Sequence, residues 1–208
     1  FRERPEIRFL TSRLFDRIGE YEEALAVLPA TKELPEAVRE DVDYHRALLY
    51  ERLDRCKDAL PLLERAAERK HERRGAARAK AAGCAQKLGR HRLYLRLSRQ
   101  LPDTFETRMA RAEAAAALKR PGAAIDEIIF AFIGFTETER AVREALASIP
   151  GGRAPIKRAQ RLARVSRLMV QRRLKEAEQA FAALPQADRR SLEGRRLEGR
   201  LFFEQKKY

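Results

Sequence analysis

The chain has 208 residues, of which 44% are hydrophobic and 37% are charged, and its formal net charge is +14. Apolar residues spread along the whole length exclude a disordered chain, and the modest Gly and Pro contents exclude collagen-like polymers. A membrane span needs ~20 consecutive apolar residues, and the longest uncharged apolar stretch, residues 128–135, is far shorter. Two cysteines are too few for a disulfide-stapled mini-domain or a multi-cysteine metal site. The composition therefore predicts a soluble, folded protein.

The ends of the chain predict that it is a piece of a longer polypeptide. It opens at Phe1 with neither Met nor a signal segment, and it stops at Tyr208 inside a repeated phrase described below. The sequence itself therefore carries no targeting information.

Helical periodicity runs through the chain from its start. Leu10, Leu14 and Ile18 recur at intervals of four, Leu48, Leu49 and Leu53 follow the same rule, and residues 162–169 repeat it. The alanine-rich stretch 110–117 favours helix strongly. The one strand-like string, residues 128–130, lies in a segment with helical spacing and is assigned to a helix.

Turn-forming residues divide these segments into about a dozen predicted helices of ten to twenty residues. Gly19 and Gly89 are typical of the left-handed residue that follows a helix. Pro121 and Pro155 suit a first helical turn, where the missing N–H costs nothing. Short turns between these helices predict an array of α-hairpins rather than a four-helix bundle.

A phrase of about 34 residues repeats along the array. Clear copies occur at residues 14–25, 49–60 and 168–177, and a truncated copy occurs at 202–208. Ala24 and Ala59 are 35 residues apart, and degenerate copies are recognisable at 89–94 and 119–125. We expect Ala24, Ala59 and Ala177 to be buried where the two helices of a hairpin cross, because small residues let helices approach closely.

The phrase resembles the tetratricopeptide repeat (TPR). The matching residues are Phe15, Gly19, Tyr21 and Ala24 in the first copy, Tyr50, Ala59, Leu63 and Ala66 in the second, and Gly199, Phe202 and Tyr208 in the last. The resemblance implies an all-α, right-handed superhelical array of antiparallel α-hairpins, with residues 1–208 forming a single elongated helical-repeat domain. The alternative is an unrelated all-α bundle that matches by chance.

A second stretch, residues 155–164 with its continuation at 174–180 and 199–203, is similar to the helical region of bacterial soluble lytic transglycosylases. That resemblance implies a non-catalytic superhelical region ahead of a lysozyme-like domain that cleaves peptidoglycan in the periplasm. The Glu-Ser pair and the Gly-Leu-Met-Gln motif of that domain do not occur in the chain. Whether the full-length protein is an enzyme therefore stays open.

Charge is distributed in blocks. Residues 69–100 and 153–208 each carry a net charge of +10, whereas residues 1–68 carry −4 and residues 101–152 carry −2. A single-sign block attracts an acidic partner, although long Arg side chains also cover apolar neighbours on ordinary solvated helices. Nucleic acid is a disfavoured partner, because only Tyr94 interrupts the basic residues of 69–100 and base stacking needs several aromatics.

No catalytic, metal-binding or cofactor-binding residue is predicted. His45, His71 and His91 lie apart from one another and from any partner at metal-ligand spacing, and no phosphate-binding glycine loop occurs. Cys56 and Cys84 lie in neighbouring repeats and are predicted to be buried free thiols, although a disulfide is conceivable in an oxidising compartment.

In TPR arrays the first helix of each hairpin lines the concave face. Carrying this phase over predicts a partner-binding groove lined by Phe9, Arg13, Tyr44, His45, Arg52, Lys80 and Lys87. Such a lining suits an acidic, partly apolar segment, with Tyr44 as anchor and the cations steering the encounter. The alternative is that Phe9 and Tyr44 simply pack between hairpins.

The sequence thus supports a non-catalytic scaffold that binds a protein, a peptide or a glycan such as peptidoglycan. The first hypothesis is the superhelical region of a periplasmic lytic transglycosylase or a similar cell-envelope protein. The second is a free-standing cytoplasmic TPR adaptor for protein–protein interaction.

Overall fold

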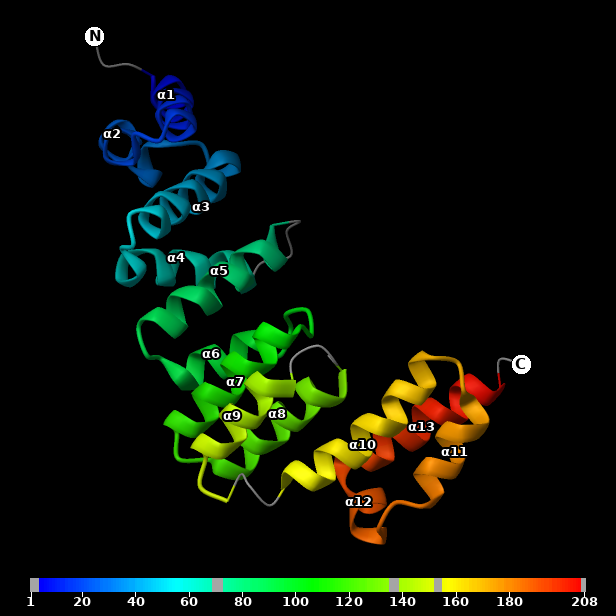
Figure 1. Cartoon of the computed structure of the whole chain (residues 1–208). Helices are drawn as coiled ribbons and strands as arrows, with labels where there is room; N and C mark the ends of the chain where they lie inside the picture. The colour runs from blue at the N-terminus through cyan, green and yellow to red at the C-terminus, as the bar shows by residue number, and fades with distance from the viewer. Residues whose placement is uncertain (1–3, 69–72, 135–138, 152–154, 207–208) are drawn as a thin grey trace. The chain divides into compact units, whose positions relative to one another are not determined.

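The computed structural model of the chain describes residues 4–68, 73–134, 139–151 and 155–206 (Figure 1), so the predictions for His71 and Tyr208 lie outside the described residues. All regular elements within these ranges are helical. They are α1 (Pro5–Ile18), α2 (Tyr21–Val27), the 3-10 helix η1 (Thr31–Glu33), α3 (Glu36–Arg52), α4 (Cys56–Glu68), α5 (Arg74–Lys87), α6 (His91–Ser98), α7 (Phe105–Ala117), α8 (Pro121–Gly134), α9 (Glu139–Ser148), α10 (Pro155–Val170), α11 (Leu174–Ala182), α12 (Gln186–Arg190) and α13 (Leu192–Lys206). The all-α prediction is confirmed, and the strand-like string at residues 128–130 lies inside α8.

Two compact units make up the chain, Phe1–Leu101 and Pro102–Tyr208. The first unit contains α1 to α6 and the second contains α7 to α13. A single elongated domain over residues 1–208, with a right-handed superhelical twist, stays a prediction.

One turn recurs in both units. Among the described residues, the first helix of five hairpins is followed by a residue in the left-handed region: Gly19, Asp54, Gly89, Lys119 and Arg172, with φ between 55° and 90°. In each case the next N–H bonds back to the carbonyl five residues earlier at 2.8–3.0 Å, as in Arg55 N–H to Tyr50 O. This pattern is the Schellman motif, which satisfies the last carbonyls of a helix and reverses the chain. The predicted caps at Gly19 and Gly89 are confirmed.

The second helix of each hairpin then crosses the first over a buried residue. Five positions after each left-handed residue stand Ala24, Ala59, Tyr94, Ala124 and Ala177, all at most 5% exposed. The predicted burial of Ala24, Ala59 and Ala177 is thus confirmed, and so is the phase of the two degenerate repeats. In four of the five hairpins this residue is an alanine, whose small side chain lets the two helices approach closely, and in the α5–α6 hairpin it is Tyr94.

The first unit has an alanine-rich interior. Helix α4 packs on both α3 and α5, and α5 packs on α6. Cys56 of α4 and Cys84 of α5 are buried and free, as predicted, and burial together with the neighbouring Cys56 thiol raises the pKa of Cys84 to about 12. Both thiols therefore pack as small apolar groups.

Helix α1 has two differently exposed sides. Phe9 and Phe15 pack against the core formed by Ala24, Leu28, Leu34, Val42 and Leu49. The predicted stripe of Leu10, Leu14 and Ile18 is more than half exposed instead. The spacing therefore predicted the helix correctly, but the aromatic residues supply its contact with the core.

The second unit has a core of larger aliphatic residues. Helix α8 packs on α7, α9 and α10, and α13 packs on α10, α11 and α12 (Figure 1). Both Pro121 and Pro155 begin a helix, as predicted. A Cβ added at Gly194, in the first turn of α13, would lie 2.2 Å from the carbonyl oxygen of Asp188. Only glycine therefore lets α13 begin against α12.

Replacing Ala59 by Leu is expected to lower the free energy of unfolding by ~1–3 kcal/mol, because the larger side chain overpacks a fully buried crossing. Urea denaturation followed by circular dichroism measures the change. Ala79→Leu, at an exposed position of α5, is the matched control and should be nearly neutral. Equal effects of the two substitutions would contradict the repeat assignment.

The left-handed turns give a reciprocal prediction. Lys119→Gly should raise the free energy of unfolding by ~0.5–1 kcal/mol, because glycine adopts this conformation without the penalty of a side chain. Gly89→Ala should lower it by ~1 kcal/mol for the same reason, since its added Cβ meets nothing within 4 Å. Thermal or urea unfolding checks both, and a neutral Gly89→Ala would show that the turn does not constrain the hairpin.

Candidate partner-binding groove

A groove of about 290 Å³ lies within the first unit. Helix α1 and helix α3 form its walls, and Arg73, directly before α5, closes one side. Its lining residues are Phe9, Arg13, Asp16, Arg17, Asp41, Tyr44, His45, Leu48 and Arg73. The structure therefore brings together Phe9, Arg13, Tyr44 and His45, as the repeat phase predicted. We call this hollow the α1–α3 groove.

Aromatic side chains give the α1–α3 groove an apolar floor. The rings of Phe9 and His45 meet edge to face, with centroids 5.7 Å apart. Tyr44 is half-buried, and the Arg73 guanidinium carbon lies 5.7 Å from its ring centroid. Phe9 also packs on the hydrophobic core, so it both lines the groove and serves as a packing residue. Tyr44 and Leu48 keep part of their apolar surface open to a ligand.

A buried hydrogen-bond relay fixes His45 in this floor. Ser12 Oγ donates to the carbonyl of Ala24 at 2.8 Å, so its oxygen accepts from His45 Nε2–H at 3.1 Å. Burial lowers the pKa of His45 below 6.5, and the nearby Arg13 charge lowers it further. The imidazole is therefore a neutral structural group that joins α1, α2 and α3.

Cations in the α1–α3 groove are only partly offset by carboxylates. Asp41 pairs with Arg73 at 2.5 Å, and Asp16 pairs with Arg52. Arg13 and Arg17 are exposed, and no ion pair joins either of them to another residue in the part of the chain that the structure describes. The groove therefore presents two uncompensated positive charges beside Tyr44 and Leu48.

The other three predicted residues do not line this groove. Arg52 pairs with Asp16 and lies 5.3 Å from the Tyr21 ring centroid. Lys80 pairs with Glu51 at 2.7 Å, and Lys87 pairs with Asp54 at 2.6 Å. Their charges are thus met by carboxylates of the hairpin before their own, and a partner would have to compete with those carboxylates.

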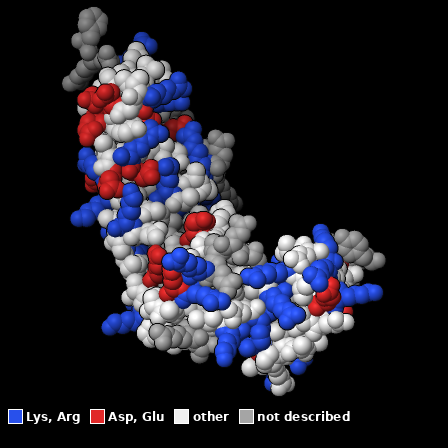
Figure 2. Space-filling model, in the orientation of Figure 1, with Lys and Arg blue, Asp and Glu red and all other residues white. Residues whose placement is uncertain are grey.

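This pairing across one repeat recurs in the first unit. Arg73–Asp41, Lys87–Asp54 and Arg96–Glu64 each join residues 32 or 33 positions apart. The basic block of residues 69–100 is therefore partly neutralised by the acidic hairpin that precedes it. Solvent screens exposed pairs of this kind, so they affect the surface charge more than the stability. Figure 2 shows acidic and basic side chains interleaved over this unit.

Sequence reasoning missed several lining residues, including Arg17, Leu48 and Arg73. Arg17 and Leu48 follow Arg13 and Tyr44 by one helical turn, so extending the same phase by four residues would have found both. Arg73 follows residues outside the described ranges and precedes α5, so helical phase could not have predicted its place in the lining. An adjoining hollow of about 160 Å³ shares Asp41, Tyr44 and Arg73 with the groove, so Tyr44 stands between two depressions.

Two kinds of site are not found within the described ranges. No group of three or more His, Cys, Asp or Glu residues there is placed to hold a metal ion. No helix there combines the length and the apolar character that crossing a membrane requires.

Comparison with solved structures finds the same type of fold. Two structures of MamA AMB-1, a TPR-like helical-repeat protein, superpose on the chain. The P212121 form gives a TM-score of 0.54 at 16% identity over 88% of this chain and 95% of that one. The C2221 form gives 0.49 at 18% identity over 86% and 95%. The match to the P212121 form supports an all-α, TPR-like helical-repeat fold for this chain.

Comparison by sequence adds no assignment. No protein-family profile matches the chain, and no curated protein is significantly similar to it.

The lowered pKa of His45 predicts a pH dependence of stability. The unfolded chain binds a proton near pH 6.5 more readily than the folded one, so the free energy of unfolding should fall as the pH drops below 6.5. Above that pH the contribution of His45 is constant. Urea denaturation between pH 5 and pH 8 measures the effect, and His45→Gln should reduce it. His91→Gln leaves His45 in place and should keep it, so loss of the dependence in that control would contradict the assignment.

Proposed function

We propose that this chain is a non-catalytic scaffold that binds an extended, acidic and partly apolar segment of a protein partner in the α1–α3 groove. The observation that carries the proposal is the placement of two uncompensated cations, Arg13 and Arg17, beside the accessible surface of Tyr44 and Leu48. Cations of this kind speed the encounter with an acidic chain, and a half-buried aromatic residue supplies the short-range affinity.

The rigidity of the groove supports a binding role. Phe9 and His45 are held by the core and by the Ser12 relay, so a ligand meets preformed walls and loses less entropy in ordering them. Carboxylates at Asp16 and Asp41 are already paired with arginines. They therefore do not cancel the charges of Arg13 and Arg17.

The cell-envelope hypothesis is a narrower form of this proposal. It rests on the sequence resemblance of residues 155–164, 174–180 and 199–203 to lytic transglycosylases. It would place the chain in the periplasm with the acidic peptides of peptidoglycan as ligand. The cytoplasmic adaptor hypothesis accounts for the same groove equally well. Pelleting the chain with purified peptidoglycan separates the two, since only the first expects retention that Arg13→Gln with Arg17→Gln abolishes.

A labelled dodecapeptide of alternating Glu and Leu tests the proposed function. Fluorescence anisotropy should show binding that the double substitution Arg13→Gln and Arg17→Gln weakens by ~10-fold or more, with a flatter dependence on salt. Tyr44→Ala should weaken it by ~10-fold or more as well, through loss of the anchor.

Lys57→Gln is the matched control, because Lys57 is an exposed cation on α4 outside the groove. It should change the affinity less than ~2-fold. The proposal fails if the double variant and Tyr44→Ala both bind like the unmodified chain. It also fails if Lys57→Gln loses as much affinity as they do.

A further inference from the structure

A second hollow, of about 270 Å³, lies within the second unit between α7, α8, α10 and α13. Its lining residues are Asp103, Arg108, Phe130, Ile133, Gly134, Ser166, Glu193, Arg196, Leu197 and Arg200. Four of them, at positions 193, 196, 197 and 200, share one face of α13. We call this hollow the α13 pocket.

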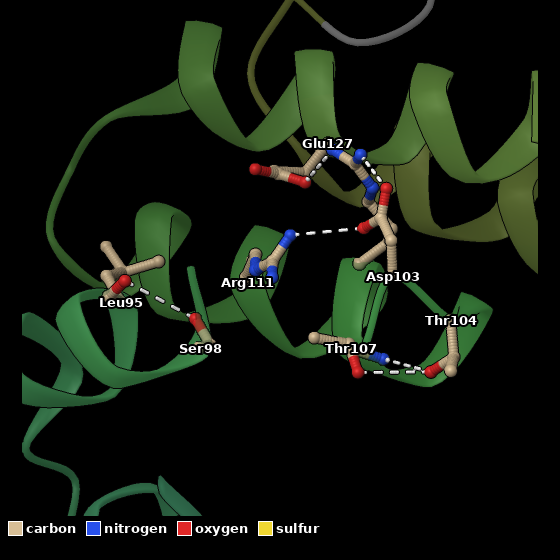
Figure 3. A network of polar contacts seen from close by, with 8 residues as sticks. Leu95, Ser98, Asp103, Thr104, Thr107, Arg111 and Glu127 are labelled. Atoms are coloured by element: carbon tan, nitrogen blue, oxygen red, sulfur yellow. Dashed lines mark hydrogen bonds and ion pairs between the residues drawn. The ribbon is translucent and has the colours of Figure 1, made fainter. Parts of the chain in front are cut away.

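Phe130 forms the apolar wall of the α13 pocket. Two guanidinium groups contact its ring, with Arg108 4.8 Å and Arg196 4.4 Å from the centroid. Arg108 is neutralised, since it pairs with Glu127 at 2.8 Å and with Asp103. Asp103 also accepts from Arg111 at 3.2 Å (Figure 3). This network fixes Arg108 in place, and its carboxylates offset the charge of the guanidinium group.

Arg196 and Arg200 are the uncompensated cations of the α13 pocket. Both are exposed, and within the described ranges neither lies in an ion pair with a carboxylate. Contact with Phe130 holds Arg196 in place, so its guanidinium is ordered before a ligand arrives. Arg200 follows one turn later on the same face of the helix. Figure 2 shows blue side chains crowding the surface of the α10–α13 region.

Two buried polar side chains in the α13 pocket lack partners. Ser166 and Glu193 are each 2% exposed and line the pocket, and no hydrogen bond or ion pair joins either to another described residue. Glu193 stands in the first turn of α13, where the helix dipole favours a carboxylate. The Gly194 N–H donates to Ser191 Oγ at 3.0 Å and holds that turn in position. The side chains of Ser166 and Glu193 line the pocket, so a ligand that entered it could supply a hydrogen-bond partner to each of them.

We propose that the α13 pocket binds an acidic side chain of a protein segment together with its backbone. A carboxylate of the segment lies between Arg196 and Arg200, a backbone N–H donates to Glu193, and a backbone carbonyl accepts from Ser166. A nucleic acid fits less well, because its backbone offers no N–H to Glu193, whereas the N–H of a peptide offsets the repulsion that this carboxylate exerts on any anion. The proposal rests on the proposed scaffold function and adds a second, separate contact site for an acidic partner.

The test uses the full chain carrying Arg13→Gln and Arg17→Gln, so that the α1–α3 groove contributes little. A fluorescein-labelled hexaglutamate peptide should bind it, and Arg200→Gln and Arg196→Gln should each weaken binding by ~10-fold. Arg195→Gln removes the same charge from the same helix outside the pocket and should change binding less than ~2-fold. Thermal melts followed by circular dichroism confirm folding. The guanidinium groups recorded over the Phe130 ring are those of Arg108 and Arg196, so the Arg200 variant stays informative if Arg196→Gln unfolds.

Polyphosphate of equal charge is the competitor that distinguishes the sources of negative charge. It should displace hexaglutamate poorly from the unmodified pocket and better from a Glu193→Gln variant, in which the repulsion is gone. Equal losses for Arg195→Gln and Arg200→Gln, or equal competition by polyphosphate with and without Glu193, would overturn the proposal. Hexaglutamate that binds the unmodified chain but not the Arg13→Gln, Arg17→Gln chain would also overturn it, while leaving the function of the α1–α3 groove standing.

Discussion

The left-handed turn after the first helix of each hairpin is the constraint on which the rest of the structure depends. It reverses the chain with the same backbone hydrogen bonds at Gly19, Asp54, Gly89, Lys119 and Arg172. Because the second helix then starts in a fixed phase, the residue five positions later falls at the helix crossing. There a small side chain such as Ala59 or Ala124 sets a close approach. Neither the turn nor the alanine would define the hairpin alone.

Fixed hairpins place side chains of different helices in one register. Arg13 of α1 and Tyr44 of α3 come to line one groove, and cations of one hairpin reach carboxylates of the hairpin before it, as in Arg96 and Glu64. The net charge of a block is therefore a poor guide to where an acidic partner would bind. Better candidates for contact with an acidic partner are the cations that this pairing leaves without a carboxylate, which are Arg13 and Arg17 in the first unit and Arg196 and Arg200 in the second.

The sequence predicted the parts of this arrangement that depend on residue type and spacing. Gly19 and Gly89 indicate left-handed turns in the sequence because glycine adopts them freely. The buried alanines are predicted by the repeat. The same turn occurs at Asp54, Lys119 and Arg172, whose residue types do not indicate it, since the helices on either side impose it. Repeat phase also located Phe9, Arg13, Tyr44 and His45. It could not reveal that Lys80 and Lys87 are paired, because ion pairs depend on rotamers and neighbouring repeats. The need for Gly194 follows from a close approach to α12 that no local pattern records.

We propose that binding uses built sites rather than the general positive charge of the surface. Amide chemical shifts of the ¹⁵N-labelled chain, followed by NMR during titration with the Glu-Leu dodecapeptide, test it most directly. The largest shifts should cluster in α1 and α3 around Arg13, Arg17, Tyr44 and Leu48, with a second cluster around Arg196 and Arg200. Small shifts spread evenly over all exposed Lys and Arg residues, Lys57 and Arg195 included, would contradict it.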